Sequence, residues 1–114
     1  RASFVINIRH HSTYHVVSNM PIESILPDNY DYVVTTFKRT APMQTYLVVF
    51  TISDFMFVEN ATVTPPQRVY ARESLINAGD AELAMQVSPE MLKFCEDYFG
   101  INYTFPKMDQ VQFL

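Results

Sequence analysis

The chain has 114 residues, a length that accommodates one small domain with a modest core. Hydrophobic residues make up 48% of it and charged residues 18%, which is too apolar for a disordered segment. The formal net charge is −4, and Lys38–Arg39 is the only place where two basic residues adjoin. Because phosphate binding requires clustered cations, nucleic acid is excluded as a partner.

The first half of the chain is predicted to form β-strands. A strand is expected over residues 4–8, and residues 14–18 are expected to return beside it as a hairpin across the polar stretch 9–13. Residues 26–30 are expected to form a loop, and residues 32–37 a further strand. Residues 46–58 are apolar on both faces, which predicts one long central strand covered on both sides.

The second half changes to a helical pattern. The polar, proline-bearing stretch 59–67 is the best candidate for a turn or boundary, and a short strand is expected over 69–72. Apolar residues then keep a helical period from Ser74 to Phe99, and Gly100 is expected to end the helix. Since Ser88 and Pro89 are typical of a helix start, the pattern predicts either two abutting helices or one helix kinked at Pro89. Residues 110–114 are typical of another strand.

This order of elements predicts an α+β chain that joins the end of one β domain to the start of an α/β domain. The longest apolar run, residues 46–58, is shorter than the about 20 residues that a membrane helix needs. The chain begins without a signal peptide or an initiator methionine. We therefore expect it to be an internal piece of a larger protein.

Three histidines, His10, His11 and His15, are the first candidates for metal chemistry. His11 and His15 would share one face of a helix, but their neighbours on both sides are β-type. A metal site would also need a fourth ligand and supporting hydrogen bonds. We therefore expect all three side chains to be solvated in a hairpin turn, and we predict no metal ligand in this chain.

Other residues that can carry chemistry are interpreted as structural. The carboxylates of Asp80 and Glu82, and of Glu96 and Asp97, stand one or two residues apart, a spacing that does not bring side chains together on a helix. Cys95 lies among apolar helical residues and is interpreted as a buried small hydrophobe rather than a nucleophile. The chain contains no HExxH, CxxC, glycine-rich phosphate loop or catalytic serine motif. No catalytic residue is therefore predicted.

Two sequons, Asn60-Ala61-Thr62 and Asn102-Tyr103-Thr104, have the N-x-[ST] form that is read by the glycosylation machinery. Both stand at positions expected to be loops. Asn60 and Asn102 are therefore predicted glycosylation sites, and they favour a secreted or cell-surface protein.

Several stretches of the chain form an ordered series of motifs. In the first half these are Ala2-Ser3-Phe4 with Ile6 and Ile8, then Ser18-Asn19-Met20-Pro21, then residues 37–50, and Ser53-Asp54-Phe55. In the second half they are Val69-Tyr70-Ala71-Arg72, Gly79 with Ala84, then Leu92, Phe94, Asp97-Tyr98-Phe99, Tyr103, Pro106-Lys107 and Asp109. In order and spacing they resemble the aminopeptidase N family of zinc metallopeptidases over nearly the whole chain. Val49, Glu73 and Thr104-Phe105 are mild departures from the family pattern.

The resemblance implies a division of the chain. Residues 1–55 would be the C-terminal part of the family's N-terminal antiparallel β domain. Residues 56–114 would be the start of its thermolysin-like catalytic domain, with the first strand and helix. The family's GxMEN loop, HExxH helix and downstream glutamate ligand match no residue here and would follow Leu114. Zinc would therefore belong to the intact parent and not to this segment.

The resemblance also implies a function for the parent, a gluzincin aminopeptidase similar to the membrane alanyl aminopeptidases, such as those of the insect midgut. Its zinc would activate water and polarise the scissile carbonyl, so that N-terminal residues are removed from peptide substrates. This segment, inactive alone, would be a scaffold held by the remainder of the same chain. The parent would be extracellular and anchored at the plasma membrane outside this segment.

An alternative stays open. The segment would then be part of an extracellular recognition surface, because relatives of this family serve as receptors for bacterial toxins or for viruses. A third reading, an unrelated secreted β module, is disfavoured by the ordered motif match.

Overall fold

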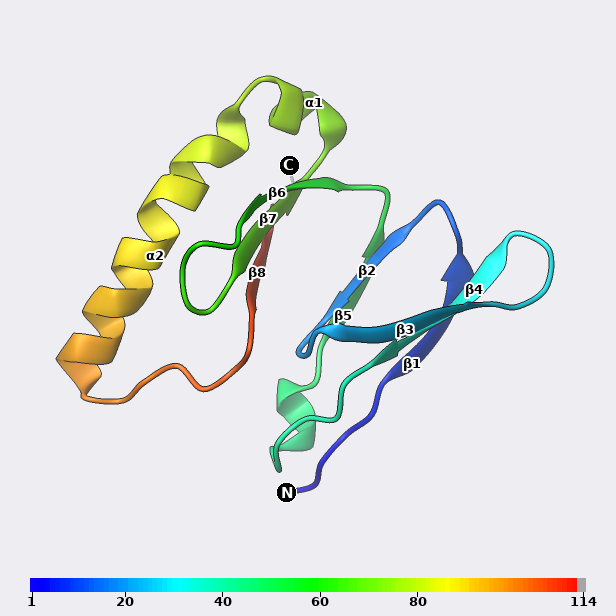
Figure 1. Ribbon diagram of the computed structural model, residues 1–114, viewed down its shortest axis with the longest axis horizontal. Helices are drawn as coiled ribbons and strands as arrows, with labels where there is room; N and C mark the ends of the chain where they lie inside the picture. Colours follow the sequence, from blue (N-terminus) through cyan, green and yellow to red (C-terminus); the bar gives the residue numbers. More distant parts are fainter. Residues whose placement is uncertain (113–114) are drawn as a thin grey trace. The chain divides into compact units, whose positions relative to one another are not determined.

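The computed structural model describes residues 1–112, which divide between two compact units (Figure 1). Unit 1 is Arg1–Asp54 and unit 2 is Phe55–Leu114. The chain is of mixed α+β type, with three small sheets and one long helix among the described residues. The last two residues of the strand expected over 110–114 lie outside the described part.

Unit 1 is built mainly of antiparallel strands. Its elements are β1 (Asn7–His11), β2 (His15–Ser18), β3 (Ile22–Pro27), β4 (Tyr32–Phe37), the 3₁₀ helix η1 (Thr45–Leu47) and β5 (Phe50–Ser53). One sheet has the order β1–β4–β3, and β2 pairs with β5 in a second sheet. The strand predicted over residues 32–37 is thereby confirmed as β4, at the centre of the larger sheet.

The predicted hairpin between residues 4–8 and 14–18 is wrong. β1 pairs with β4, with Asn7 opposite Thr36, and β2 pairs with β5, with Val16 opposite Ile52. Side chains near the end of β2 explain this choice of partner. Ser18 Oγ donates to the Val49 carbonyl at 2.7 Å. The Asn19 side-chain amide donates to the Leu47 carbonyl and accepts from the Val49 N–H, both at 3.0 Å.

Two further expectations in unit 1 need correction. The single strand expected over residues 46–58 is divided among η1, β5 and β6 (Met56–Asn60), and Tyr46 and Val49 are 80% and 57% exposed instead of covered. The apolar run therefore does not form one central strand: several of its side chains are exposed, while Phe55 is buried. Residues 26 and 27, expected in a loop, end β3. Because β3 is an edge strand, Pro27 costs it no ladder hydrogen bond with an outer neighbour.

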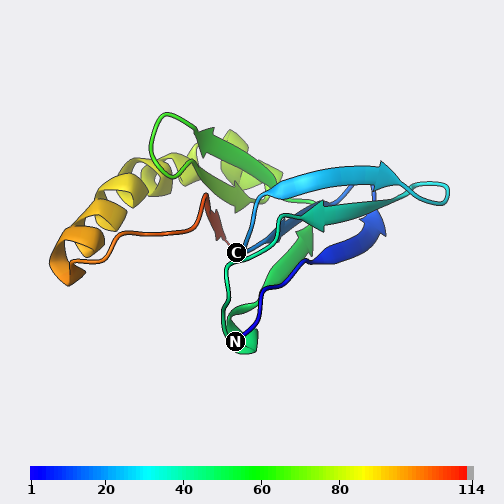
Figure 2. The same ribbon diagram turned by 60° about the horizontal axis from the view of Figure 1, so that its bottom comes forward.

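Unit 2 is a three-stranded sheet covered on one face by a helix (Figures 1 and 2). β6 is followed by β7 (Gln67–Ala71), α1 (Glu73–Asn77), α2 (Asp80–Phe99) and β8 (Met108–Val111). The sheet order is β6–β7–β8, with β7 antiparallel to β6 and parallel to β8. Val69 of β7 packs against Ala81 and Met85 of α2 in the unit's buried apolar cluster.

α2 is one helix that continues through Pro89, so no second helix begins at Ser88. The Ser88 hydroxyl instead donates to Gln67 of the neighbouring sheet. The break between helices falls earlier, at Gly79, whose φ of 79° is a left-handed conformation that glycine adopts without a steric penalty. Gly100, with φ of 67°, ends α2 as predicted.

Candidate functional site

The three histidines do not form the solvated cluster that was expected. His10 is only 7% exposed, and its Nε2 lies 2.6 Å from Thr35 Oγ1 on β4. Its Nδ1 lies 2.9 Å from the His11 carbonyl oxygen, so both ring nitrogens are engaged. The expectation was wrong for His10 because β1 pairs with β4, which covers this side chain, and not with residues 14–18. His15 is exposed, as expected.

No metal site is formed by this part of the chain. Within residues 1–112 there is no group of three or more His, Cys, Asp or Glu side chains that could hold a metal ion. Asp80, Glu82 and Asp97 are exposed on α2, while the Glu96 carboxylate accepts the Tyr103 backbone N–H at 2.7 Å. A zinc ion of the kind that the family resemblance implies does not fit these residues, and no catalytic step is assigned to them.

Cys95 is exposed, so the expectation of a buried side chain was wrong. It lines a cleft below the end of α2, together with apolar residues of the helix and of the following loop, among them Leu92, Phe99 and Phe105. Its neighbours on the helix are apolar, as the sequence indicated, but the cleft beside it leaves the Cys95 side chain exposed.

The face of the unit 2 sheet opposite α2 carries a polar and aromatic cluster centred on Arg68. Strand alternation directs Val69 toward the helix and its neighbours Arg68 and Tyr70 to the other face. Arg68 Nε lies 3.1 Å from a Glu59 carboxylate oxygen, and its NH1 donates to the Tyr70 hydroxyl at 3.1 Å. Its guanidinium carbon is 4.2 Å from the Phe57 ring centroid. These contacts join β6 and β7 on this face.

The electrostatics of this cluster favour a charged arginine beside a neutral tyrosine. Burial lowers the pKa of Arg68, but its bonds to Tyr70 and Glu59 outweigh burial and raise the pKa overall. Burial raises the pKa of Tyr70, and the negative charge of Asp109 adds to the rise, although the bond from Arg68 opposes it. The cluster therefore joins β6 to β7 through a charged arginine and a neutral tyrosine.

A second polar network ties α2 to β7 and β8 of the sheet. Ser88 Oγ donates to Gln67 Oε1 at 2.6 Å and accepts a hydrogen bond from the Gln110 side-chain amide. Gln67 is only 2% exposed, so its amide oxygen depends on this donor. The network fixes β8 beside β7, with Gln110 opposite Val69. The sequence signal here, Ser88 before Pro89, had been interpreted as a helix cap.

The loop between α2 and β8 is anchored through its middle. The Tyr103 hydroxyl donates to the Lys107 carbonyl at 2.9 Å, and the Lys107 ammonium bonds the Asp109 carboxylate. Burial raises the pKa of Tyr103, and the nearby Asp109 carboxylate raises it further. This anchoring leaves the neighbouring Asn102 exposed.

The first sequon begins at the end of a strand of unit 2, and the second lies in the loop between α2 and β8. Asn60 is the last residue of β6, and its Oδ1 accepts hydrogen bonds from the Thr62 N–H at 3.1 Å and the Thr62 hydroxyl at 2.6 Å. Asn102 follows α2 by three residues.

Comparison with known proteins gives the class of the chain. Residues 1–47 match the Peptidase M1 N-terminal domain. The chain is 34% identical over 110 residues to the thyrotropin-releasing hormone-degrading ectoenzyme of Rattus norvegicus, covering 96% of this chain and 10% of that protein. It is 34% identical over 112 residues to glutamyl aminopeptidase of Bitis rhinoceros, covering 97% and 12%. It is 36% identical over 113 residues to aminopeptidase Q of Homo sapiens, covering 96% and 11%.

With 96–97% of the chain covered, these alignments include residues of both units, whereas the family model matches residues of unit 1. The chain belongs to the M1 aminopeptidase family, as a partial segment that includes part of the family's N-terminal domain. It spans about a tenth of the length of the curated relatives that it matches. None of the helices within residues 1–112 has the length and hydrophobicity needed to cross a membrane.

Proposed function

We propose that this chain is the scaffold segment of a zinc-dependent aminopeptidase that removes N-terminal residues from peptides. The observation that carries the proposal is the similarity to aminopeptidases over 96–97% of this chain, a span that takes in residues of both units. Relatives with the printed names aminopeptidase and ectoenzyme support an extracellular hydrolase, located at the cell surface.

The proposal assigns residues 1–55 to the end of the N-terminal β domain and residues 56–114 to the start of the thermolysin-like catalytic domain. Two features support this assignment. The family's N-terminal domain is matched within unit 1, by residues 1–47. The boundary between the two compact units falls between Asp54 and Phe55 in the sequence. A parallel β7–β8 pair connected by a long helix is also the kind of element from which an α/β domain is built.

The role proposed for this segment is mechanical. The Ser88 network holds β8 in register on β7, and the Arg68 cluster holds β6 on the other side of β7. In the parent, zinc would supply activation of water, with ligands from parts of the polypeptide outside this chain. The residues described here would keep the first strands of the catalytic domain in a fixed register.

The proposal is tested by sequencing the transcript downstream of the codon for Leu114 and then assaying its product. We expect GxMEN and HExxH motifs in frame, followed by a distant glutamate. The full-length protein should release amino acids from aminoacyl-4-nitroanilides, lose activity with a zinc chelator and regain it with added zinc. The 114-residue chain, assayed in parallel, should be inactive. An open reading frame without these motifs, or a full-length product without peptidase activity, would refute the proposal that the parent is an aminopeptidase.

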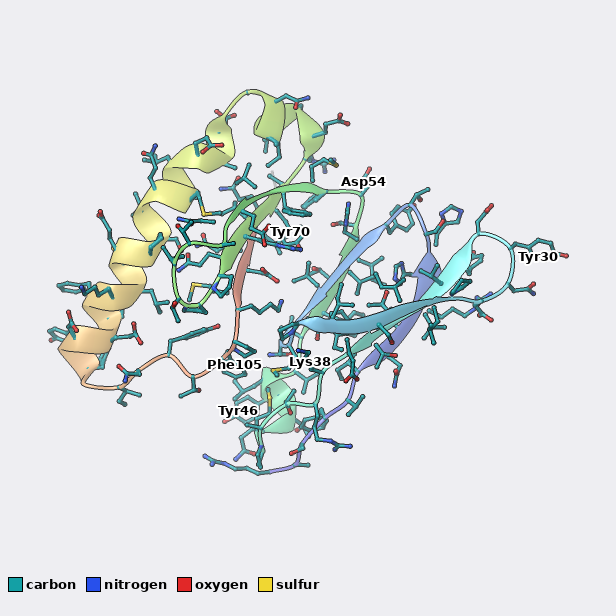
Figure 3. The ribbon with its side chains drawn as sticks, in the orientation of Figure 1. Tyr30, Lys38, Tyr46, Asp54, Tyr70 and Phe105 are labelled. Carbon is teal, nitrogen blue, oxygen red and sulfur yellow. The ribbon has the colours of Figure 1, made fainter. Side chains whose placement is uncertain are left out.

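A second candidate function is a recognition surface for a bacterial toxin or a virus. Tyr30, at the turn between β3 and β4, favours it, because the ring is 93% exposed and points away from the strands (Figure 3). Tyrosine is enriched among the residues that contribute most of the binding energy at protein interfaces. Binding of a toxin or viral spike to the purified chain, abolished by Tyr30→Ala, would support this function. Binding no stronger than to an unrelated β protein would remove it for this segment.

A further inference from the structure

We propose that unit 2 carries N-linked glycans at both Asn60 and Asn102, and that the two glycans stand over the same charged flank of α2. This inference rests on the extracellular location that is part of the proposed function. It goes beyond that function in two ways. It assigns two modification sites, and it proposes which side of unit 2 faces solvent.

The first acceptor, Asn60, lies where β6 runs into the loop of residues 61–66. Its Oδ1 is held by the backbone N–H and the hydroxyl of Thr62, at 3.1 and 2.6 Å. The two polar members of the sequon therefore contact each other in a local turn of the Asx type. Ala61 and Thr62 are exposed and Asn60 is half-buried, so solvent reaches this turn.

The second acceptor, Asn102, lies in the loop that joins α2 to β8. The middle residue of its sequon, Tyr103, is fixed at both ends, by Glu96 through its N–H and by the Lys107 carbonyl through its hydroxyl. With Tyr103 turned inward, Asn102 and Thr104 are both exposed. The anchoring thus presents the two residues that the transferase must read.

The two sequon loops meet along one side of α2. Val63 and Thr64, just beyond the first sequon, line a shallow pocket together with Asn102. The helix residues in that pocket include Glu90, Lys93 and Asp97. Sugar on both asparagines would therefore cover a charged, hydrated surface.

A different flank of α2 is apolar and contributes no residue to the pocket between the sequon loops. Its exposed residues recur at steps of three or four, which places them on one stripe: Leu83, Val87, Met91, Phe94 and Tyr98. None of these five residues lines the pocket that joins the two sequon loops. The glycans would therefore occupy the charged flank and leave this stripe without sugar.

The modification is a group transfer from a lipid-linked oligosaccharide. The side-chain amide Nδ2 of each asparagine forms a bond to the anomeric carbon of the first sugar and loses one proton. The bond from that carbon to the pyrophosphate oxygen breaks, and the lipid pyrophosphate leaves. The lipid-linked donor and the transferase are supplied by the secretory pathway.

The site assignment is tested on the 114-residue chain fused to a heterologous secretory leader and expressed in animal cells. Cell-associated and secreted protein are both analysed, before and after peptide-N-glycosidase treatment in H₂¹⁸O. We expect two steps of mobility shift in the wild type, one step in Asn60→Gln and in Asn102→Gln, and none in the double variant. Mass spectrometry should find ¹⁸O-labelled aspartate at both positions.

Matched variants separate the sequon from nonspecific effects. Thr62→Ala and Thr104→Ala should each remove one step, while Thr62→Ser and Thr104→Ser should keep it. Asn19→Gln should change nothing, because Asn19-Met20-Pro21 is not a sequon. Wild-type protein with no shift, or with one step only, overturns the inference. Because the leader is imposed and no activity is measured, that result leaves the aminopeptidase proposal standing.

The placement of the glycans is tested by acylation of lysines. Lys93 lines the pocket between the sequon loops, whereas Lys38 is an exposed lysine of unit 1. With a limiting amine-reactive ester, we expect Lys93 to react several-fold more slowly in the glycosylated chain than in the double variant. The rate at Lys38 should be the same in both. Equal acylation rates of Lys93 in the glycosylated chain and in the double variant would overturn the proposal that both glycans cover the same flank of α2.

Discussion

The two units bury different kinds of side chains. Among the described residues, the buried set of unit 1 is mostly polar: His10, Ser18, Thr35 and Thr40 lie beside Val16, Phe37 and Met43. The buried set of unit 2 is almost entirely apolar: Phe55, Val69, Tyr70, Ala71, Ala81 and Met85, with Gln67 as the polar member. Hydrogen bonds between strands therefore specify the pairing in unit 1, which buries few apolar side chains, whereas unit 2 depends on the packing of a helix against a sheet.

Because of this difference, different substitutions are expected to destabilise the two units. In unit 1, Thr40 Oγ1 accepts the Phe4 N–H at 2.9 Å, and His10 meets Thr35 across the β1–β4 pair. Such bonds define the strand pairing but contribute only about 1 kcal/mol each. The single large ring buried in this unit, Phe37 at 1% exposure, must supply much of the apolar stabilisation.

The largest effect is expected from Phe37→Ala. Loss of this buried ring should cost about 3–5 kcal/mol, because it removes apolar burial and leaves a cavity. That loss is comparable with the whole stability of a unit of this size. Hydrogen exchange followed by mass spectrometry should show loss of amide protection in β1, β3 and β4, while α2 and β7 keep theirs.

Two variants check that comparison. Phe94→Ala, at a ring that is 63% exposed, should change the protection of neither unit. Met85→Ala, within the buried cluster of unit 2, should reduce protection in α2 and β7 and leave β4 unchanged. If Phe37→Ala removes protection from both units together, the two units are one cooperative structure and the contrast between them is broken.

A smaller effect is expected from Ser88→Ala. The change leaves the buried Gln67 amide oxygen without its donor and deprives Gln110 of its acceptor, at a cost of about 1–3 kcal/mol. Protection should fall most in β8, since this network holds it to β7. Ser74→Ala, at an exposed serine of α1, is the control and should have no effect. Equal results for the two alanines would show that the network adds nothing to unit 2.

Elements with a local signal were predicted well from the sequence. β4 follows from its β-branched and aromatic residues, and the end of α2 follows from Gly100. The pairing of β2 with β5 was missed because it depends on hydrogen bonds from Ser18 and Asn19 to residues about thirty positions away. No periodicity in either segment encodes that choice.

The candidate site shows the same limit. Family membership followed from the motifs and their order along the chain, which can be recognised without knowing which strands pair. The burial of His10 and the exposure of Cys95 were both misjudged, because burial depends on which element covers a side chain. The contact of Arg68 with Glu59 joins two strands across a loop, so it became apparent only once β6 and β7 were paired.

The smallest predicted effect is a loss of stability of unit 2 at alkaline pH, with no corresponding loss in unit 1. Tyr70 and Tyr103 both have pKa values raised by burial and by Asp109, above the ordinary tyrosine value of about 10. A raised folded pKa means that the native state holds its protons to higher pH than the unfolded chain does. The resulting stabilisation is complete below about pH 10 and is lost as pH rises through the folded pKa.

Phenolate absorbance and urea unfolding measure this effect together. The phenolate absorbance should include a phase from Tyr70 and Tyr103 above about pH 10, the ordinary tyrosine value. The urea midpoint of the α2 circular dichroism signal should be lower at about pH 11 than at about pH 9. Tyr103→Phe should reduce that decrease, because it removes one titrating group, whereas Tyr30→Phe should not. A single phenolate phase with no change in the urea midpoint would mean that the face of the sheet opposite α2 is as open to solvent as the β3–β4 turn.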